Sequence, residues 1–295
     1  MSAKIIDGNA IAEQMRAEIK AQAQELKAKH GVVPGLAVVL VGEDPASQVY
    51  VRMKGKACVE AEFFSDERKL PADTSEADLL KLVAKLNADP KIHGILVQLP
   101  LPKHIDESKV LLAVDPAKDV DGFHPVNVGK MMVGQPTFLP CTPHGVVQML
   151  VRSGIKIPGK HVVIVGRSNI VGRPLMNMLS QKNDHANATV TCVHTRTKDM
   201  ANFTRQADIL IAAAGQPKMI TADMVKPGVV VIDVGVNRVD DPTAKRGFRL
   251  VGDVDFEAVK EKASAISPVP GGVGPMTITM LLYNTIAATK AKLGI

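Results

Sequence analysis

The sequence contains no tryptophan, and aromatic residues make up only 3% of its 295 positions. Proteins that bind single-stranded nucleic acid stack bases on aromatic side chains, and most nucleic-acid-binding proteins gather Lys and Arg into one patch or stripe. The formal net charge here is +6, but the basic residues are interleaved with acidic ones along the chain. We therefore expect small anionic ligands and no nucleic-acid partner.

Cysteines and long apolar runs are also scarce. The three cysteines, Cys58, Cys141 and Cys192, are an odd number at wide spacing, without the CxxC pair of a zinc site or redox dithiol. The apolar stretches, such as 36–41 and 229–236, are much shorter than the roughly 20 residues that cross a membrane. The first 20 residues also lack the pattern of an export signal. These absences predict reduced thiols, no metal centre, no membrane partner and a cytoplasmic protein.

Strands and helices are predicted to alternate along the chain, which indicates an α/β fold with a mostly parallel sheet. In the first half we expect a helix towards His30, strands over 36–41 and 94–98, and helices over 45–62 and 75–87. A second series resembles a nucleotide-binding half-fold. It comprises strands over 161–165, 188–193, 209–213 and 229–234, with helices over 171–181 and 200–205.

Gly, Pro, Asp and Asn are concentrated between Lys118 and Pro143, which indicates a domain junction. The apolar helix predicted over 276–293 is expected to return to the first domain. We therefore assign 1–120 with 276–295 to a catalytic domain, 140–275 to a Rossmann-type nucleotide-binding domain, and 121–139 to a connecting segment.

The segment HVVIVGRSNIVGRP, residues 161–174, joins a β-rich stretch to a predicted helix through a glycine turn. At such a junction a parallel sheet presents backbone N–H groups and a helix dipole to phosphate. Gly166 and Gly172 take the first and last positions of the GxGxxG fingerprint, but Ser168 replaces the middle glycine. A pyrophosphate would therefore lie further out or use the serine hydroxyl.

The next predicted strand is followed by Thr195 and Arg196, where NAD-binding units usually place an acid that binds the ribose 2′-hydroxyl. A hydroxyl and a guanidinium suit a 2′-phosphate instead, and Arg167 is a second candidate because guanidinium binds phosphate in a bidentate manner. We therefore predict NADP, although solvated loop arginines without a ligand would give the same pattern. Gly215 and Gly235, after two later strands, would let a nicotinamide approach.

Tyr50 and Lys54 are four residues apart on the helix expected from Pro45, so they share a face. Most lysines in the middle of a helix are solvated, so spacing alone leaves the role of Lys54 open. Gln98 ends a predicted strand just before a proline corner, where its amide could orient a water or a substrate. Cys141 lacks a base nearby in sequence, and we expect it to pack near the ligand and not to act as a nucleophile.

Three carboxylates, Asp115, Asp119 and Asp121, follow within seven residues. They could bind a metal, but their Pro, Val and Gly neighbours do not resemble a calcium loop. We expect one carboxylate to accept hydrogen bonds from substrate N–H groups and the others to serve in turns or caps. His124 and His144 lie beside prolines in turn-forming sequence and are left out of the catalytic set.

Six segments taken together resemble the methylenetetrahydrofolate dehydrogenase/methenyltetrahydrofolate cyclohydrolase family. They are YVRMKGKA at 50–57, GILVQLPLP at 94–102, KDVDGFH at 118–124, PCTPHG at 140–145, VGRSNIVGRP at 165–174 and PGGVGPMT at 270–277. They occur in the family's order and spacing over essentially the whole chain. One departure is AEFF at 61–64, where the family commonly has a glycine that ends the catalytic helix.

The resemblance implies an amino-terminal domain across a cleft from a Rossmann-type NADP domain, with folate in the cleft. It implies that Tyr50 stacks on the folate, that Lys54 is the catalytic lysine assisted by Gln98, and that Asp121 holds the pterin ring. The other residues it implies in binding are Gly271, Gly272 and Pro275 for folate and Arg167, Ser168 and Thr195 for NADP.

The implied activity is oxidation of 5,10-methylenetetrahydrofolate to the methenyl form with NADP⁺, followed by hydrolysis to 10-formyltetrahydrofolate. Hydride transfer mainly needs placement of two bound molecules, whereas hydrolysis needs proton transfers, which an amine and an amide can assist. A lysine beside a cationic intermediate in a partly dry cleft should have a lowered pKa. The resemblance also implies a homodimer, polyglutamylated substrates and a role in purine biosynthesis. A monofunctional dehydrogenase and a non-catalytic nucleotide-binding protein remain as alternatives.

Overall fold

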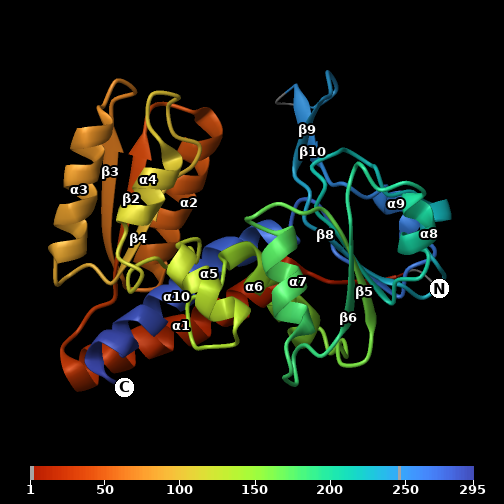
Figure 1. Ribbon diagram of the computed structural model, residues 1–295, viewed down its shortest axis with the longest axis horizontal. Coiled ribbons are helices and arrows are strands. Elements are labelled where there is room, and N and C mark those ends of the chain that lie inside the picture. The colour runs from red at the N-terminus through yellow and green to blue at the C-terminus, as the bar shows by residue number, and fades with distance from the viewer. Residues whose placement is uncertain (1–2, 245–246) are drawn as a thin grey trace. The chain divides into compact units, whose positions relative to one another are not determined.

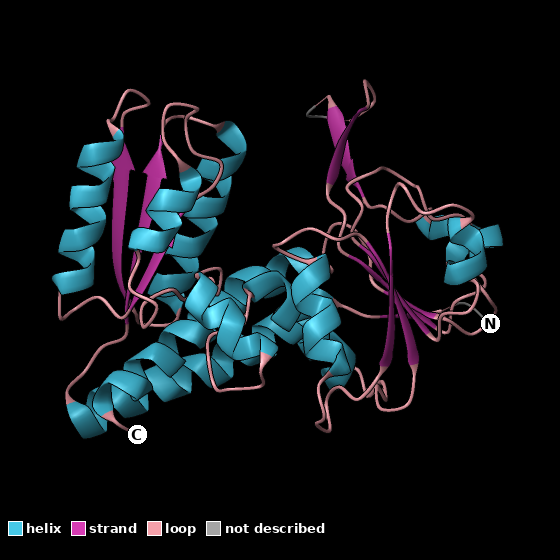
Figure 2. Ribbon diagram, in the orientation of Figure 1, coloured by secondary structure: helices cyan, strands magenta, loops and turns pink. Residues whose placement is uncertain are grey.

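The computed structural model describes residues 3–244 and 247–295, and their contacts divide the chain into two compact units. The six-stranded unit contains the residues up to Ala12 together with Thr142–Thr277, and the three-stranded unit contains Glu13–Cys141 with Ile278–Ile295. Both combine helices with parallel strands (Figures 1 and 2), which confirms the predicted α/β class. No helix within the described ranges is long and apolar enough to span a membrane.

The three-stranded unit has a parallel sheet in the order β3-β2-β4. The central strand β2 (Gly35–Val41) and β4 (Gly94–Val97) are buried at every residue, because helices cover both faces of the sheet. Helices α3 (Glu76–Ala88) and α4 (Glu107–Ala113) pack on one face, and α2 (Pro45–Glu60) contacts β2 and β3 (Figure 1). The edge strand β3 (Phe64–Leu70) reads FSDERKL and was not predicted, since it lacks an apolar run.

Helix α2 ends at a turn in which Glu62 takes a positive φ of 60°. Its N–H donates to the Val59 carbonyl at 3.1 Å, and the Phe63 N–H donates to the Cys58 carbonyl at 2.9 Å. This hydrogen-bond pattern usually places glycine where Glu62 stands. The AEFF departure therefore leaves the helix end intact but puts a glutamate into a backbone conformation that favours glycine.

The six-stranded unit has a fully parallel sheet in the order β1-β11-β8-β7-β5-β6. From β5 the chain moves outward to β6 and then returns to the other side of β5 to form β7. Ligands of open α/β sheets bind at the carboxyl ends of strands beside such a reversal of direction. The strands are β1 (Lys4–Ile5), β5 (His161–Val165), β6 (Thr189–Val193), β7 (Ile209–Ala212), β8 (Val230–Asp233) and β11 (Ala265–Ile266).

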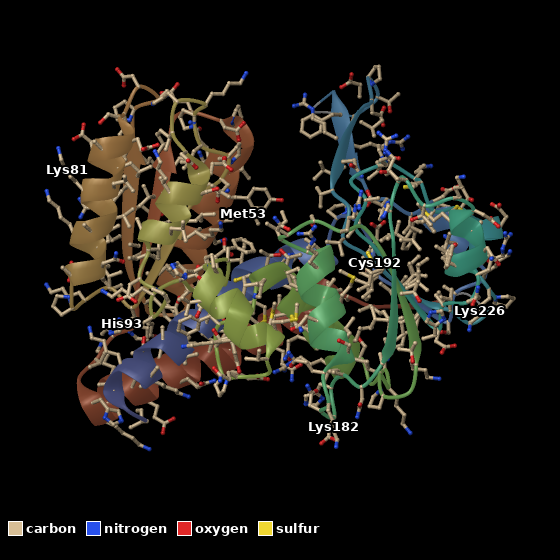
Figure 3. The ribbon with its side chains drawn as sticks, viewed as in Figure 1. Met53, Lys81, His93, Lys182, Cys192 and Lys226 are labelled. Carbon is tan, nitrogen blue, oxygen red and sulfur yellow. The ribbon has the colours of Figure 1, made fainter. Side chains whose placement is uncertain are left out.

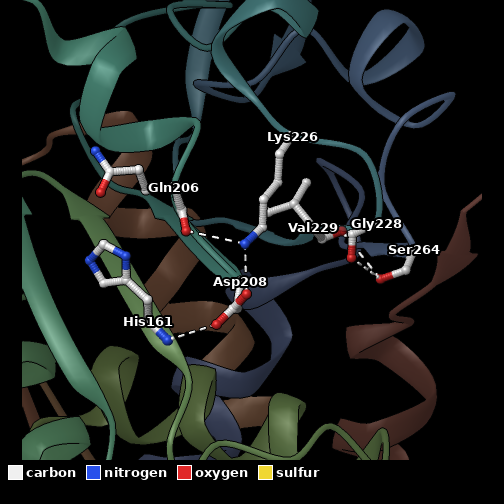
Figure 4. Close-up of polar contacts among 7 residues, drawn as sticks. All are labelled: His161, Gln206, Asp208, Lys226, Gly228, Val229 and Ser264. Atoms are coloured by element: carbon white, nitrogen blue, oxygen red, sulfur yellow. Dashed lines mark hydrogen bonds and ion pairs between the residues drawn. The ribbon is translucent and has the colours of Figure 1, made fainter.

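The amino-terminal edge of this sheet is held by side chains of its turns (Figure 4). The Asp208 carboxylate accepts hydrogen bonds from the His161 N–H at 2.9 Å and from the Lys226 ammonium at 2.7 Å. The Ser264 hydroxyl donates to the Gly228 carbonyl at 2.8 Å. These contacts join the starts of β5, β7, β8 and β11, so they stabilise the edge opposite the predicted ligand site.

Shorter elements complete the six-stranded unit. Strands β9 (Asn237–Asp240) and β10 (Phe248–Val251) form an antiparallel pair. The helices are α7 (Gly172–Ser180), α8 (Met200–Thr204), the 3-10 turn η1 (Ala222–Met224) and α9 (Phe256–Val259).

The structure divides the chain differently from the sequence at two places. Strand β1 pairs with β11, so the first residues belong to the nucleotide-binding sheet and not to the other domain. Residues 121–139, expected as a connection, contain helix α5 (Pro125–Met132) and group with the three-stranded unit. Helices α1 (Gly8–His30), α6 (Cys141–Arg152) and α10 (Val273–Leu293) each begin in one unit by sequence and end in the other.

Candidate active site

Helix α2 carries Tyr50 and Lys54 in the three-stranded unit. It begins with Pro45 at its first turn, and the preceding Asp44 carboxylate accepts a hydrogen bond from the Ser47 N–H at 2.7 Å. Lys54 is only 9% exposed, whereas Tyr50, one turn earlier, is 40% exposed. Arg52 and Met53 beside it are exposed, and Figure 3 labels Met53. Lys54 is therefore not the solvated lysine that its mid-helix position alone would suggest.

The side chains of Lys54 and Gln98 are hydrogen-bonded to each other. The Lys54 Nζ donates to the Gln98 Oε1 at 2.8 Å. The Gln98 Nε2 donates to the Leu99 carbonyl at 2.6 Å, and this second bond directs the amide oxygen towards the lysine. A helix and the carboxyl end of β4 thus bring together two side chains that are 44 positions apart.

Burial lowers the pKa of Lys54, and the charges of Asp121 and Cys141 oppose that change. Burial raises the pKa of Asp121 to about 6, while Lys54 lowers it and Asp119 raises it. Burial also raises the pKa of Cys141 well above its usual range, so its thiol stays protonated near neutrality. The site therefore holds a carboxylate beside an amine that loses its proton more readily than a solvated lysine.

The three aspartates of the 115–121 segment have different partners. Asp115 accepts a hydrogen bond from the N–H two residues later at 2.8 Å. Asp119 accepts from the His124 N–H and the Asn127 amide, both at 2.8 Å, and His124 caps helix α5. Within the described ranges no backbone N–H is hydrogen-bonded to the Asp121 carboxylate. Two carboxylates thus serve in turns, as predicted, whereas the Asp121 carboxylate has the Cys141 thiol as its hydrogen-bond partner and lies beside Lys54.

Asn284 on α10 holds the loop of Asp121, and sequence reasoning did not find it. Its side chain is 2% exposed, and its amide donates to the Val120 carbonyl at 2.8 Å and to the Leu139 carbonyl at 2.9 Å. Gly122 packs against the backbone of Leu139 and Pro140, because a Cβ on Gly122 would lie 2.7 Å from the Pro140 nitrogen. The residues on either side of Asp121 are therefore fixed against the segment that leads into α6.

The glycine turn after β5 lies at the point where the strand order reverses. A Cβ on Gly166 would lie 2.1 Å from the Ala213 carbonyl oxygen, and a Cβ on Gly172 would lie 2.1 Å from the Gly166 carbonyl oxygen. The Ser168 hydroxyl accepts a hydrogen bond from the Val171 N–H at 3.1 Å. Close backbone approach thus explains both glycines, and the serine shapes the turn.

The residues predicted to bind phosphate are exposed at the carboxyl ends of β5 and β6. Arg167 and Ser168 follow β5, and Thr195 and Arg196 follow β6. Burial raises the pKa of Cys192 on β6, but the guanidinium groups of Arg167 and Arg173 lower it. Arg173, which the sequence reasoning passed over, therefore adds positive charge near this edge. Exposed guanidinium and hydroxyl groups beside a helix start fit the phosphates of NADP.

The remaining predicted residues also lie in the six-stranded unit. Gly215 has a φ of 67° and no atom within 4 Å of its Cβ position, so one side of this turn is open. Gly271 accepts a hydrogen bond from the Asn9 N–H at 3.2 Å, and a Cβ on Gly8 would lie 1.8 Å from the Gly272 carbonyl oxygen. Pro275 follows within the first turn of α10. The described part of the chain contains no group of three His, Cys, Asp or Glu side chains arranged for a metal ion.

Comparisons with known proteins match both units. Residues 6–121 match the family model described as tetrahydrofolate dehydrogenase/cyclohydrolase, catalytic domain, and residues 140–293 match the NAD(P)-binding domain of the same family. The bifunctional protein FolD of Geotalea uraniireducens is 62% identical over 98% of this chain and 100% of its own length.

Two solved structures are similar over nearly the whole chain. The bifunctional FolD enzyme of Campylobacter jejuni is 49% identical with a TM-score of 0.93, covering 99% of this chain and 100% of that one. The Trypanosoma brucei methylenetetrahydrofolate dehydrogenase-cyclohydrolase, complexed with NADP cofactor and an inhibitor, is 40% identical with a TM-score of 0.94, covering all of both chains.

Proposed function

Because the chain belongs to the tetrahydrofolate dehydrogenase/cyclohydrolase family, we propose that Lys54, Gln98, Tyr50 and Asp121 form the site of its hydrolytic reaction. The protein is an NADP-dependent bifunctional enzyme. It oxidises 5,10-methylenetetrahydrofolate to 5,10-methenyltetrahydrofolate and hydrolyses that product to 10-formyltetrahydrofolate. The observation that carries the site assignment is the buried Lys54 bound to Gln98 at 2.8 Å.

Lys54 is suited to proton transfer in the hydrolytic step. Water attacks the carbon of the methenyl cation, and the attacking water must lose a proton. Because burial lowers the pKa of Lys54, its neutral form is available to accept that proton nearer to neutral pH. The Gln98 oxygen fixes the position of the lysine nitrogen, since it accepts a hydrogen bond from it.

Asp121 and Tyr50 are proposed to hold the folate. The Asp121 carboxylate would accept hydrogen bonds from N–H groups of the pterin, because the other two aspartates of its segment are occupied by backbone donors. The exposed ring of Tyr50 offers a surface on which the substrate can stack. We assign Gly271, Gly272 and Pro275 to the folate site by family resemblance.

NADP, when bound, accepts the hydride from the bridging carbon of the substrate. We propose that Arg167, Ser168, Thr195 and Arg196 bind its phosphates, supported by their exposure at the strand ends. The turns at Gly166, Gly172, Gly215 and Gly235 would leave room for its backbone and ring. A slower reaction with NADP than with NAD would contradict the assignment of these arginines.

Three variants test the role of Lys54. In Lys54→Met the amine is lost, and we expect cyclohydrolase turnover to disappear while NADP still binds. In Lys54→Arg the charge remains, but a guanidinium does not release its proton near neutrality, so hydrolysis should also be lost. Lys56→Met is the matched control, because Lys56 is exposed two positions later on the same helix and, among the residues that the structure describes, forms an ion pair only with Glu60 at 3.6 Å. Normal hydrolysis of methenyltetrahydrofolate by folded Lys54→Met would overturn the assignment.

We further propose a cytoplasmic homodimer that acts on polyglutamylated folates and supplies one-carbon units for purine biosynthesis, on the strength of the family resemblance. Light scattering tests the assembly. A mass near twice the 31.5 kDa of one chain supports the dimer, and a mass of one chain contradicts it.

A further inference from the structure

Two buried aspartates lie at the carboxyl ends of strands β8 and β10 in the six-stranded unit. Asp233 is 3% exposed and Asp253 is 0% exposed. Neither forms an ion pair with Lys or Arg in the part of the chain that the structure describes. A buried carboxylate is unfavourable unless donors surround it, so the positions of its partners are closely constrained.

Asp253 binds the turn that follows β7. Its Oδ2 accepts hydrogen bonds from the Ala214 N–H at 2.6 Å and from the Gly215 N–H at 2.8 Å. Its Oδ1 accepts from the Asn237 amide at 2.8 Å. The 214–215 turn lies beside the reversal in strand order, where the cofactor is expected.

Asp233 holds the backbone that carries Asp253. Its Oδ1 accepts from the Asp253 N–H at 2.9 Å and from the Gly235 N–H at 3.0 Å, and its Oδ2 accepts from the Val254 N–H at 3.0 Å. The Asp233 N–H in turn donates to the Ser267 hydroxyl at 2.8 Å. Each carboxylate therefore fixes, by accepting backbone hydrogen bonds, a turn that follows another strand.

Two glycines let the carboxylates pack this closely. A Cβ on Gly235 would lie 2.2 Å from the Asp253 Oδ1, and a Cβ on Gly252 would lie 1.8 Å from the Asp233 Oδ2. Gly215 differs, since it has no atom within 4 Å of its Cβ position. The Asp253 carboxylate thus holds the 214–215 turn from inside the protein and leaves the other side of the turn open.

We propose that Asp253 is a positioning residue for NADP, which fixes the Ala214–Gly215 turn against which the cofactor lies, and that Asp233 holds Asp253 in place. Without Asp253, the two N–H groups of the turn would lose their acceptor and the turn would rearrange to satisfy them. The inference rests on the proposed NADP site at this edge of the sheet. It adds Asp253, Asp233 and Asn237 to the residues that determine cofactor affinity.

The test compares three variants of the full-length enzyme. In Asp253→Asn only one acceptor oxygen remains, so either the turn or the Asn237 amide loses its partner. Asn237→Ala removes one bond to Asp253 and leaves the two bonds to the turn. Asp223→Asn is the control, since Asp223 is an exposed aspartate of the same unit. The measurements are KM for NADP⁺ in the dehydrogenase reaction, cyclohydrolase turnover of methenyltetrahydrofolate without NADP⁺, and thermal melting.

We expect Asp253→Asn to raise the KM for NADP⁺ by about tenfold, equivalent to about 1.4 kcal/mol, and Asn237→Ala to raise it less. Cyclohydrolase turnover should stay within about twofold of wild type in both, because the hydrogen bonds removed lie in the six-stranded unit, whereas Lys54 and Gln98 lie in the other one. An unchanged KM in both variants would overturn the proposal, and so would equal losses of both activities.

If Asp253→Asn fails to fold, Asn237→Ala decides the question alone. Failure of the proposed function gives a different result from failure of this inference. In the first case Lys54→Met keeps its cyclohydrolase activity or the wild type shows no NADP-dependent oxidation. In the second case the wild-type enzyme catalyses both reactions and Lys54→Met loses hydrolysis, as proposed. The Asp253→Asn and Asn237→Ala variants then keep the wild-type KM for NADP⁺ or lose both activities equally.

Discussion

Replacing Asn284 with Ala should weaken both the stability of the protein and its hydrolytic reaction. The amide of Asn284 donates to the Val120 and Leu139 carbonyls and contacts the Cys141 sulfur at 3.8 Å. In the Ala variant the Val120 carbonyl keeps the Cys141 thiol as a donor at 3.4 Å, so the Leu139 carbonyl is the one that loses its partner. A buried polar group that loses its partner costs about 1–3 kcal/mol, and we predict a loss of about 2 kcal/mol. For a domain of about 150 residues this lowers Tm by roughly 4–8 °C.

Asn284→Asp gives a sharper test, because the introduced carboxylate would face two carbonyl oxygens. Its pKa in the folded protein would be raised above the unfolded value near 4. Because the pKa is raised in the folded protein, the introduced carboxyl group contributes most to stability below about pH 4, where it is protonated. That contribution is lost as the pH rises through the folded pKa. We therefore predict that Asn284→Asp is less stable than Asn284→Ala at pH 7 and that this difference disappears towards pH 4.

Urea unfolding at several pH values and cyclohydrolase turnover at 25 °C provide the measurements. Asn87→Ala is the matched control, because Asn87 makes a comparable pair of hydrogen bonds in the same unit, with the Ala113 carbonyl at 2.7 Å and the Asp115 N–H at 2.9 Å. It should lose stability and keep its turnover. Full turnover in Asn284→Ala, or equal stability of the Ala and Asp variants at pH 7, would refute the reasoning.

Other side-chain interactions give three further predictions. Asp121→Asn should move the pH dependence of cyclohydrolase kcat to lower pH, because the Asp121 charge raises the pKa of Lys54; a shift to higher pH would contradict the coupling. Glu62→Gly should raise Tm, since glycine adopts the φ of 60° without steric cost. The Glu62 carboxylate meets Lys20 at 3.1 Å and Gln24 at 3.0 Å, but such exposed interactions are weak; a lower Tm would show that they outweigh the strain. Hydrogen bonds from Lys226 and then His161 hold the pKa of Asp208 below its usual value. That contribution is present above the unfolded pKa and is lost as the pH falls through the folded one. Wild type should therefore lose more stability than Asp208→Asn between about pH 5 and pH 2, and parallel acid titrations by circular dichroism would disprove this.

The sequence predicted those elements whose burial is uniform. Strands β2 and β4 were found because every residue in them is apolar or small and buried. Strand β3 was missed because it lies at an edge, where polar side chains reach solvent. Helix α5 was missed within the junction because His124 and Pro125, read as turn residues, form its cap and first turn. Local pattern therefore identifies buried strands well, but it misses a polar edge strand and a short helix that begins in sequence resembling a turn.

Some features of the candidate site could likewise be predicted from the sequence and others could not. Tyr50 and Lys54 could be paired from their spacing, and strand ends located Gln98 and the glycine turn after β5. The hydrogen bond of Lys54 with Gln98 and the low exposure of Lys54 depend on how α2 packs on the sheet, which no local pattern contains. Asn284 gives no local signal at all, since its partner Val120 is 164 positions away.

The distance along the chain between Asn284 and Val120 also has a consequence for synthesis on the ribosome. A growing chain emerges from its amino terminus, and domains commonly fold as they emerge. The segment with Asp121 is made well before Asn284, which follows Val120 by 164 positions. The hydrolytic site is therefore assembled from early residues but completed by a residue that is made much later. We expect nascent chains that end before α10 to carry every proposed catalytic side chain. They would still lack the hydrogen bonds from Asn284 that hold the Asp121 loop.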